Sequence, residues 1–481
     1  MKITFIQPPY YNEDGTSRYP SIIPLAIPSM STSLKKRGHK TEAIDIFLNN
    51  YSKSKVTEIL SNTKTDLFAI SALSSAYSYV IWLCDEIKRL HPDKKIIIGG
   101  SLATHNPKTV LNNSKADICV IGEGEKTIVE LAENIPFQKI KGIAFKKKDR
   151  IIWNSKRKQI GCLDEIGFPD LKILDVERYI NIPLTREDWG KRSINLYTSR
   201  GCPFNCSFCS ISFPNVRLRS VKNIREDIKT VIKKYKPDIL LFPDELFTQS
   251  KQRTRKLCEE IKKHNIKWFC QGRVNIVDEE LLRIMKDAGC IKIIFGIESG
   301  SQEILDSMNK RTTVKKNLAA IKACHKAGLA VSPQLMFGFP EENEETIEET
   351  IEFCKEAKIG RLFFSILTLL PGSELYDKCL KKGIIKDEHE YLLSLNSTGK
   401  KLINLTIWSD KEFGQKLEYM RRKILINHYK YLIKNPKMFA KTFFLKAEFI
   451  MKYVRFHGFT ESIKRIVYYL QKDPLVFFSP V

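Results

Sequence analysis

The stretch of sequence that decides the fold class is RGCPFNCSFCS, residues 200–210. It places three thiols at Cys202, Cys206 and Cys209, a C-x3-C-x2-C spacing that follows the strand-like segment INLYTS. Soft thiolate ligands suit an iron–sulfur cluster or zinc. A structural zinc site closes with four ligands, and the next histidine downstream, His264, lies in a solvated KKHN segment. Three thiolates that leave one iron open therefore fit this sequence better than zinc does.

The region around these cysteines, residues 194–385, alternates strand-like and helix-like segments. The strand candidates after INLYTS are ILLFPDE, IKWFCQGR, CIKIIFGIESG, AVSPQLMFGFP and RLFFSILTLLPG, and an amphipathic helix separates each from the next. About six such units predict a partial barrel of the (β/α)6 type. Functional residues are then expected where the strands end.

Residues 1–140 show a similar alternation and are predicted to form a separate domain. Strand-like KITFIQ, KTEAIDIF, DLFAISAL, KKIIIGG and ADICVIGEG alternate with helix-like segments such as SYVIWLCDEIKRLHP. This pattern predicts a Rossmann-like, doubly wound parallel α/β sheet whose ligand site lies beyond the carboxyl ends of the strands. Residues 141–193 contain few long periodic segments and are predicted to be a connector. Residues 386–481 are predicted to be a basic, helical C-terminal region.

The cysteine spacing, with the aromatic Phe208 before the last cysteine, resembles the signature of the radical S-adenosylmethionine (SAM) superfamily. The resemblance implies a [4Fe-4S] cluster on Cys202, Cys206 and Cys209, with SAM bound to the open iron through its amino and carboxylate groups. It also implies that one electron, from a flavodoxin- or ferredoxin-type donor, cleaves SAM to methionine and a 5′-deoxyadenosyl radical. That radical abstracts hydrogen from a substrate.

The same resemblance implies SAM contacts at the ends of the later strands. Asp244 and Glu245 in LLFPDELF would approach the SAM amino group, and Arg273 would face its carboxylate. Glu298 and Ser299 in FGIESGS would lie in the region that contacts the ribose. Each acidic residue has an alternative interpretation as a helix N-cap or a loop carboxylate.

Several N-terminal segments resemble the cobalamin-binding domain found ahead of many radical SAM modules. They are IPLAIPSMSTSLKKRGHKTEAID, ISALSSAYS, KKIIIGG with the serine that follows it, and ADICVIGEGE. Glycine at a strand end lets the backbone approach a bulky planar ligand, and small hydroxyl groups nearby can bond its polar edge. The resemblance predicts cobalamin contacts from Ser71, Ser74, Gly99, Gly100, Ser101, Gly122 and Glu123.

One feature of other cobalamin domains is missing from this sequence. The D-x-H-x-x-G motif, which supplies a histidine to cobalt, does not occur, and His39, His91 and His105 lack its Asp and Gly. Many radical SAM relatives also lack the motif and leave that face of cobalt without a protein histidine. The alternative is a Rossmann-like scaffold that no longer binds cobalamin.

Together, the two resemblances imply methyl transfer to an unactivated carbon or to phosphorus. An sp3 C–H bond offers no proton that a side-chain base can remove, and a radical solves this problem. Relatives that catalyse ring formation or rearrangement are an alternative. Methylthiotransferases are another, but their N-terminal domain usually carries three further cluster cysteines, whereas residues 1–160 contain only Cys84 and Cys119. A cobalamin- or redox-sensing binding module fits poorly with an intact three-cysteine motif.

The composition is that of a globular protein from a reducing compartment. Hydrophobic residues make up 43% and charged residues 28% of the 481, and no apolar run is long enough for a membrane-spanning helix. The segment MKITFIQPPYY predicts a first strand and not a signal peptide. We therefore expect a cytoplasmic protein whose nine other cysteines pack as small hydrophobic side chains.

The net charge of +25 is concentrated in the C-terminal region, since residues 401–481 hold 16 Lys and Arg against 6 Asp and Glu. Basic and aromatic residues interleave in 411–481, which is typical of helices on an anionic membrane surface and of helices packed on a barrel with a solvated basic face. We favour packing on the barrel; a lipid substrate would favour peripheral membrane contact. No RNA-binding motif occurs. The predicted partners are thus a small-molecule or lipid substrate and an electron donor, not nucleic acid.

Overall fold

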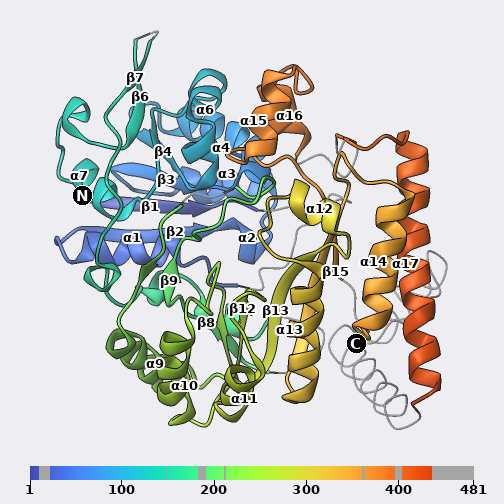
Figure 1. Ribbon diagram of the computed structural model, residues 1–481. Helices are drawn as coiled ribbons and strands as arrows, with labels where there is room; N and C mark the ends of the chain where they lie inside the picture. The colour runs from blue at the N-terminus through green and yellow to red at the C-terminus, as the bar shows by residue number, and fades with distance from the viewer. Residues whose placement is uncertain are drawn as a thin grey trace, which may run out of the picture.

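The computed structural model describes residues 1–9, 22–148, 150–182, 191–210, 213–359, 363–395 and 403–435. In this part of the chain, two large sheets are each covered by helices (Figure 1). A seven-stranded sheet occupies the N-terminal part, and a six-stranded sheet follows it. The α/β fold class and its two successive sheets confirm the prediction from the sequence.

The N-terminal sheet has the strand order β2-β1-β3-β4-β5-β6-β7. Strands β1 to β5 are parallel, as the alternation predicted, and β6 and β7 are antiparallel to their neighbours. The strands are β1 (Lys2–Gln7), β2 (Lys40–Asp45), β3 (Leu67–Ser71), β4 (Lys95–Gly99), β5 (Ile118–Val120), β6 (Ile143–Lys147) and β7 (Arg150–Trp153).

Helices cover both faces of this sheet because successive side chains of a strand point to opposite faces. Phe68 and Ile70 of β3 pack in a buried cluster with α4, whereas Leu67 and Ala69 pack in a second buried cluster with α1 and α7. The helices are α1 (Ala26–Lys35), α2 (Ile46–Asn49), α3 (Lys53–Ser61), η1 (Ser74–Ala76), α4 (Tyr77–Leu90), α5 (Ser101–His105), α6 (Pro107–Asn113), α7 (Glu125–Ala132) and η2 (Phe137–Lys139).

The β6–β7 hairpin extends the N-terminal domain beyond residue 140, where the sequence placed its boundary. Ile143 of β6 pairs with Val120 of β5, so the hairpin continues the parallel sheet as an antiparallel edge. The apolar stretch IAF of β6 is buried in the same sheet core. Charged residues in this hairpin made it resemble a connector, and periodicity alone does not identify β5, the preceding strand, as its pairing partner.

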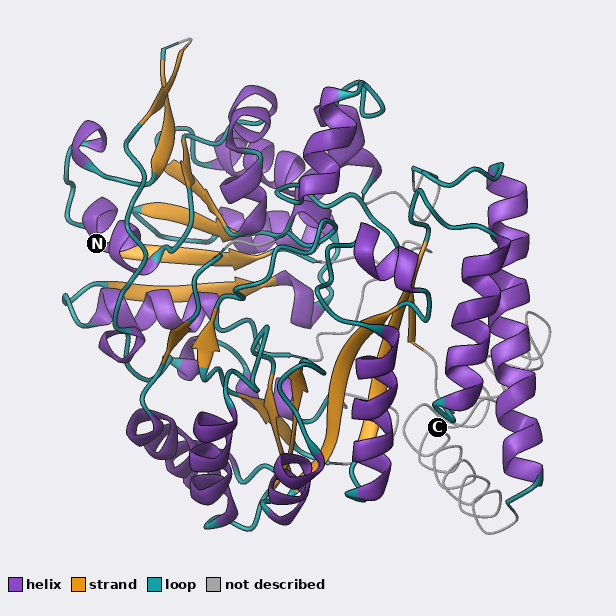
Figure 2. Cartoon of the chain, in the orientation of Figure 1, coloured by secondary structure: helices purple, strands orange, loops and turns teal. Residues whose placement is uncertain are grey.

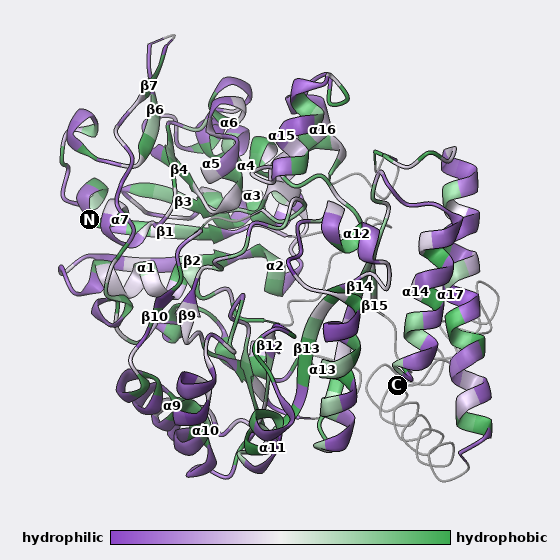
Figure 3. Cartoon of the chain, in the orientation of Figure 1, coloured by the Kyte–Doolittle hydropathy of each residue, from purple (hydrophilic) through white to green (hydrophobic). Residues whose placement is uncertain are grey.

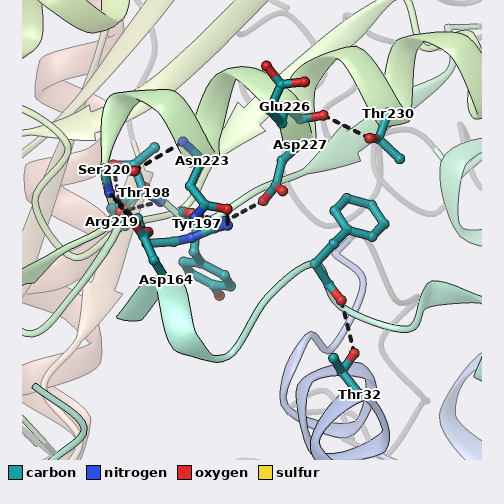
Figure 4. Close-up of polar contacts among 12 residues, drawn as sticks. Thr32, Asp164, Tyr197, Thr198, Arg219, Ser220, Asn223, Glu226, Asp227 and Thr230 are labelled. Atoms are coloured by element: carbon teal, nitrogen blue, oxygen red, sulfur yellow. Dashed lines mark hydrogen bonds and ion pairs between the residues drawn. The ribbon is translucent and has the colours of Figure 1, made fainter. Parts of the chain in front are cut away.

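The remaining connector holds short elements that tie the two domains together. They are η3 (Leu163–Glu165), η4 (Leu171–Ile173) and α8 (Val176–Ile180). Figure 4 shows two of the ties: the Asp164 carboxylate accepts a hydrogen bond from the Ser220 N–H at 3.0 Å, and the Thr32 hydroxyl donates to a connector carbonyl, that of Phe168, at 2.9 Å. The connector is therefore bonded both to helix α1 and to the residue before helix α9 (Val221–Tyr235).

The second sheet is fully parallel, and its strands follow one another in chain order, β8-β11-β12-β13-β14-β15. Figure 2 shows it as a curved fan of strands with helices along its outer side, which confirms the predicted partial barrel. The strands are β8 (Ser193–Asn195), β11 (Ile239–Phe242), β12 (Lys267–Gly272), β13 (Cys290–Glu298), β14 (Ala330–Phe337) and β15 (Phe363–Ile366), and a separate pair is β9 (Ser199–Arg200) with β10 (Arg217–Leu218).

The helices of this domain pack on the sheet through apolar faces and leave polar faces outside, as the hydrophilic colouring of α9 and α10 in Figure 3 illustrates. They are α9 (Val221–Tyr235), α10 (Lys251–Lys262), α11 (Glu279–Asp287), α12 (Gln302–Ser307), α13 (Val314–Lys326), α14 (Glu344–Glu356) and α15 (Glu374–Lys381).

The C-terminal region contributes two described helices, α16 (Glu388–Ser394) and α17 (Asp410–Ile433). Leu392 of α16 joins the core of the N-terminal domain, and Met420 and Ile424 of α17 join the core of the barrel beside α14. The predicted packing of α17 on the barrel is therefore confirmed, and the rest of the predicted basic region, residues 436–481, lies outside the described residues. No helix among those described combines the length and apolar character needed to cross a membrane.

Candidate functional site

The three cysteines lie on the loop that leaves β9 and returns to the domain at β10. Gly201 starts the loop with φ of +93°, and a side chain there would place its Cβ 2.4 Å from the Asn215 carbonyl oxygen. Only glycine fits this position without strain. The next residue, Cys202, donates its N–H to the Phe213 carbonyl at 3.2 Å. The loop is therefore held tightly at its first cysteine.

Later residues of the cysteine loop are bonded to two other parts of the barrel. Ser207 donates its N–H to the Met308 carbonyl at 2.9 Å and accepts the Leu375 N–H at 2.8 Å. The Ser210 hydroxyl donates to the Pro371 carbonyl at 2.6 Å. Because the end of α12 and the start of α15 both hold the loop, the thiols keep fixed positions relative to the barrel.

The thiols of Cys202, Cys206 and Cys209 share one local environment. Burial raises the pKa of Cys202 and raises that of Cys209 to about 11, and the neighbouring thiols add to both shifts. Yet no group of three or more His, Cys, Asp or Glu side chains in the described ranges is close enough to hold a single metal ion. Zinc needs its ligands about 2.0–2.3 Å from one centre, whereas a cubane cluster takes each thiolate on a different iron. The absence of a mononuclear centre among the described residues is therefore compatible with a cluster, which does not need its thiolates to meet at one ion.

Arg273, predicted to face the SAM carboxylate, lies beside this loop. Its guanidinium stacks on the Phe204 ring, 3.4 Å from the ring centroid, and its charge acts on the Cys202 thiol. The residue is 8% exposed, and its Nε and Nη2 atoms have no hydrogen-bond partner among the described residues. Buried donors are normally satisfied, so this guanidinium is suited to bind an anionic ligand.

Asp244 and Glu245, predicted together as SAM contacts, have different environments. Asp244 is fully buried and accepts hydrogen bonds from the Thr198 N–H at 2.9 Å and the Ser199 hydroxyl at 2.6 Å. These hydrogen bonds therefore fix the position of the segment that leads to the cysteines. Glu245 is exposed and accepts a hydrogen bond from the Gly201 N–H at 3.3 Å.

Glu298 ends β13 in a strained conformation, with φ of +65° directly after an irregularity in the pairing with β14. Its carboxylate forms an ion pair with Lys310 at 2.5 Å, and both side chains are 10% exposed. The Lys310 ammonium also lies 5.7 Å from the Phe208 ring centroid and acts on the Cys209 thiol. A left-handed non-glycine residue is typical of a functional site. Lys310 is a member of this site that the sequence reasoning did not identify.

Ser299 is directed into the protein and not toward the open end of the barrel. It is 3% exposed, accepts the Ser301 N–H at 3.1 Å and lies 3.1 Å from the Thr350 hydroxyl. The close approach of α14 requires glycine at position 300, where a Cβ would lie 2.5 Å from Phe353. The segment after Glu298 thus fixes the strand end against α14.

A cavity of about 560 Å³ opens at the carboxyl ends of β1, β3, β4 and β5, where the sequence placed the cobalamin site. Its size is within the usual range for ligand sites. Of the predicted cobalamin contacts, those that line this cavity are Ser71, Gly99, Gly100, Ser101, Gly122 and Glu123. Ser74 is not among the lining residues; it is 6% exposed and begins η1.

The floor of the cavity is shaped by backbone and small side chains. Gly122 has φ of +83°, and no atom lies within 4 Å of the position that a Cβ would occupy. Gly100 has φ of +85°, and a Cβ there would lie 2.3 Å from the Ala72 carbonyl. Among the described residues that line the cavity there is no histidine.

The second domain closes the cavity with residues that the sequence reasoning did not assign to it. They are Leu196, Tyr197, Ser199, Arg200, Phe213, Arg219, Asp227 and Glu245. Arg200 directly precedes the cysteine loop, and this adjacency was the one feature of the sequence that could have indicated its place at the site. Residues from the ends of both sheets therefore form one wall, which places the cavity next to the cysteine loop.

Two family models match this chain. One, described as the radical SAM superfamily, matches residues 196–354, and the other, described as a B12 binding domain, matches residues 15–132. The first match contains the cysteine loop, and the second contains β3, β4 and β5, whose residues line the cavity. Both matches agree with the two resemblances found in the sequence.

Known proteins resemble the chain over most of its length. An uncharacterized methyltransferase of Pyrococcus horikoshii is 28% identical over 94% of this chain and 96% of its own. The anaerobic magnesium-protoporphyrin IX monomethyl ester cyclase of Rubrivivax gelatinosus is 28% identical over 81% of this chain and 72% of its own. The structure of the radical SAM methyltransferase TsrM from Kitasatospora setae, with cobalamin and a [4Fe-4S] cluster bound, matches 79% of this chain and 75% of TsrM with a TM-score of 0.64 at 17% identity, which shows a shared fold.

The parallel partial barrel and the three-cysteine loop define a radical SAM enzyme. With the B12-binding domain that precedes the barrel, the chain belongs to the cobalamin (B12)-binding-domain radical SAM enzyme family.

Proposed function

We propose that this chain is a cobalamin-dependent radical SAM methyltransferase that acts on a small-molecule substrate. The observation that carries the proposal is a single cavity whose wall comes from both domains. Gly122 lines it from the N-terminal sheet, and Glu245 lines it from the barrel while bonding the Gly201 N–H. A cofactor in this cavity would lie beside the peptide that leads into Cys202.

The cysteine loop would hold the [4Fe-4S] cluster through Cys202, Cys206 and Cys209, because the loop is anchored at both ends and its thiols do not converge on one ion. Arg273 would bind the SAM carboxylate with its two unpartnered donors. Glu298, held by Lys310, would lie on the ribose side of SAM. Asp244, Ser299 and their partners would position the strands that carry these groups.

The cavity would hold cobalamin against the ends of the N-terminal strands. Its apolar lining includes Phe5, Ile97 and Val120, and the Ser71 and Ser101 hydroxyls offer hydrogen bonds to amide groups at the ligand's edge. When bound, the cluster with SAM supplies a radical that removes hydrogen from an unactivated position, and cobalamin supplies the methyl group. The chain's own contribution is to hold both groups in one interdomain space.

The alternative is a radical SAM cyclase without methyl transfer. One relative that covers 81% of this chain is named as a cyclase, so similarity alone does not separate the two reactions. They differ in their products. A methyltransferase forms S-adenosylhomocysteine together with 5′-deoxyadenosine, whereas a cyclase forms no S-adenosylhomocysteine.

The test is anaerobic reconstitution of the full chain with iron and sulfide, followed by incubation with SAM, dithionite and hydroxocobalamin. Chromatography would quantify 5′-deoxyadenosine and S-adenosylhomocysteine, and the absorbance of the desalted protein would report bound corrin. We expect both nucleosides and retained corrin. Corrin with 5′-deoxyadenosine alone would favour the cyclase. No corrin and no 5′-deoxyadenosine from folded protein would contradict the proposal.

A further inference from the structure

The residue that precedes the cysteine loop is ion-paired across the domain boundary. Arg200 donates from Nη1 to Glu123 at 2.8 Å and from Nη2 to Glu125 at 2.6 Å. Glu123 lies on the loop that follows β5 and Glu125 is the first residue of α7; their side chains are only 4% and 7% exposed. One guanidinium fork therefore joins two carboxylates of the N-terminal domain to the peptide that enters the cluster loop.

A second arginine completes this network from the neighbouring strand. Arg217 is the register partner of Arg200 in the β9–β10 pair, and its Nη1 donates to Glu123 at 2.7 Å. Glu123 also accepts the Ile160 N–H of the connector at 2.7 Å. Two cations and two carboxylates balance, so the network is neutral as a whole. A network whose charges balance can stay buried, although the Nε and Nη2 atoms of Arg217 have no hydrogen-bond partner among the described residues.

The network lies between the two cofactor sites of the proposed function. Glu123, Glu125 and Arg200 all line the cavity. Arg200 is followed directly by Gly201 and Cys202, and the Gly201 N–H bonds Glu245, another cavity-lining residue. A displacement of Arg200 would therefore move the first cluster ligand as well as the cavity wall.

We propose that the Arg200–Glu123–Glu125 network couples occupancy of the cavity to the geometry of the cysteine loop, which rests on the proposed function that the cavity takes cobalamin. A ligand in the cavity displaces water from the exposed side of these ion pairs. Charge pairs strengthen when water is excluded, so the filled cavity holds Arg200, and with it Cys202, in one position. By thermodynamic reciprocity, a ligand that orders the cluster site tightens binding in the cavity by the same factor.

The test measures the dissociation constant of hydroxocobalamin by equilibrium dialysis, with and without SAM, on full-length protein carrying its reconstituted cluster. In the wild type, we expect SAM to tighten cobalamin binding by about fivefold or more. In Arg200→Gln, the ratio of the two constants should fall toward one, with cluster iron content unchanged. Arg217→Gln is the matched control, because it removes the other cation on Glu123 without touching the peptide that leads to Cys202. It should weaken cobalamin binding and keep the ratio.

The readings separate the inference from the proposed function. An unchanged ratio in Arg200→Gln, a ratio lost equally in both variants, or a wild-type ratio of one with cobalamin bound would each overturn the coupling and leave the proposed function standing. No cobalamin binding by the wild type would overturn both. If Arg200→Gln does not fold, Arg200→Lys serves instead, since it keeps the charge and loses the fork; its ratio should lie between those of the wild type and one.

Discussion

In both sheets, the carboxyl ends of the parallel strands carry a candidate site, yet the two sites are built in opposite ways. The edge of the N-terminal sheet is made of glycines, small hydroxyls and apolar side chains around an open space, with Gly122 directly under it. The edge of the barrel is dense with thiols and buried charges, among them Arg273, Glu298 and Lys310. The site on the N-terminal sheet depends on small residues that leave space for a ligand, whereas the site on the barrel depends on specific thiols and charged side chains.

This difference predicts which substitutions matter at each edge. At the barrel edge, removing a functional group should be damaging, because a specific charge or ligand is lost. At the N-terminal edge, adding atoms should be damaging, because the ligand needs the space and the backbone conformation that glycine provides. The comparison fails if additions are harmless at the cavity or if removals are harmless at the barrel.

The largest expected effect is the loss of a cluster thiolate. Cys202→Ala should abolish the absorbance of the reconstituted cluster and the formation of 5′-deoxyadenosine, because three thiolates are the minimum set the loop offers. Cys258→Ala is the control, since Cys258 lies on α10, is 1% exposed in the barrel core and is not among the residues that line the cavity. It should keep both signals. Equal loss in the two variants would mean that Cys202 acts only through stability.

The next effect concerns the unpartnered guanidinium at the barrel edge. Arg273→Gln should raise the KM for SAM by about 10- to 100-fold, which corresponds to about 1.5–3 kcal/mol for a charged hydrogen bond. Arg283→Gln, on the exposed face of α11 and paired with Glu279, should leave the KM unchanged. Steady-state formation of 5′-deoxyadenosine at varied SAM concentration measures both. An unchanged KM in Arg273→Gln would remove Arg273 from the SAM site.

At the N-terminal edge, Gly122→Val tests the effect of added atoms. The valine would project into the cavity from a left-handed backbone, so cobalamin should bind at least about tenfold more weakly, or about 1.4 kcal/mol. Gly328→Val has a similar positive φ, +66°, and also no atom within 4 Å of its Cβ position. It should lose a similar amount of stability, about 1–2 kcal/mol, without losing affinity. Equilibrium dialysis and urea denaturation separate the two; equal affinities would show that the cavity is not the cobalamin site.

The sequence predicted the fold well because its strands are strongly apolar and regularly spaced. KITFIQ became β1 (Lys2–Gln7), and the successive strand candidates of the barrel became β11 to β15 in the same order. The rule that parallel strands end at one edge was enough to place Gly99 and Gly122 together at a cavity. Local pattern and topology determine these features directly.

What the sequence did not reveal depends on contacts between distant segments. Arg200 and Glu123 are 77 positions apart, and nothing local indicates that they are ion-paired. Asp244 and Glu245 are neighbours at one strand end, but one is buried beneath the loop and the other borders the cavity. Both residues lie beyond the end of β11, so the alternation of side chains along a strand does not indicate which of the two is directed toward a ligand.

The last prediction decides what Asp244 does. Burial raises the pKa of Asp244 from its ordinary value of 3.8 to about 6. The folded chain then holds this proton more tightly than the unfolded chain, so the free energy of unfolding falls as pH rises from about 4 to about 6, by up to about 3 kcal/mol. Asp244→Asn removes this dependence and keeps an acceptor for the Thr198 N–H.

Urea denaturation of cluster-free Asp244→Asn and wild type across this range should therefore show similar stability near pH 4 and an advantage for the variant above pH 6. Because the carboxylate is fully buried beneath the loop, the KM for SAM should not change. A raised KM with unchanged stability would instead mean that Asp244 reaches SAM directly, as the strand-end position first predicted. In that case Asp244 would be a further ligand contact of the barrel site that its burial does not reveal. The barrel site would then depend on one more specific charged group, and the difference from the N-terminal site would be larger.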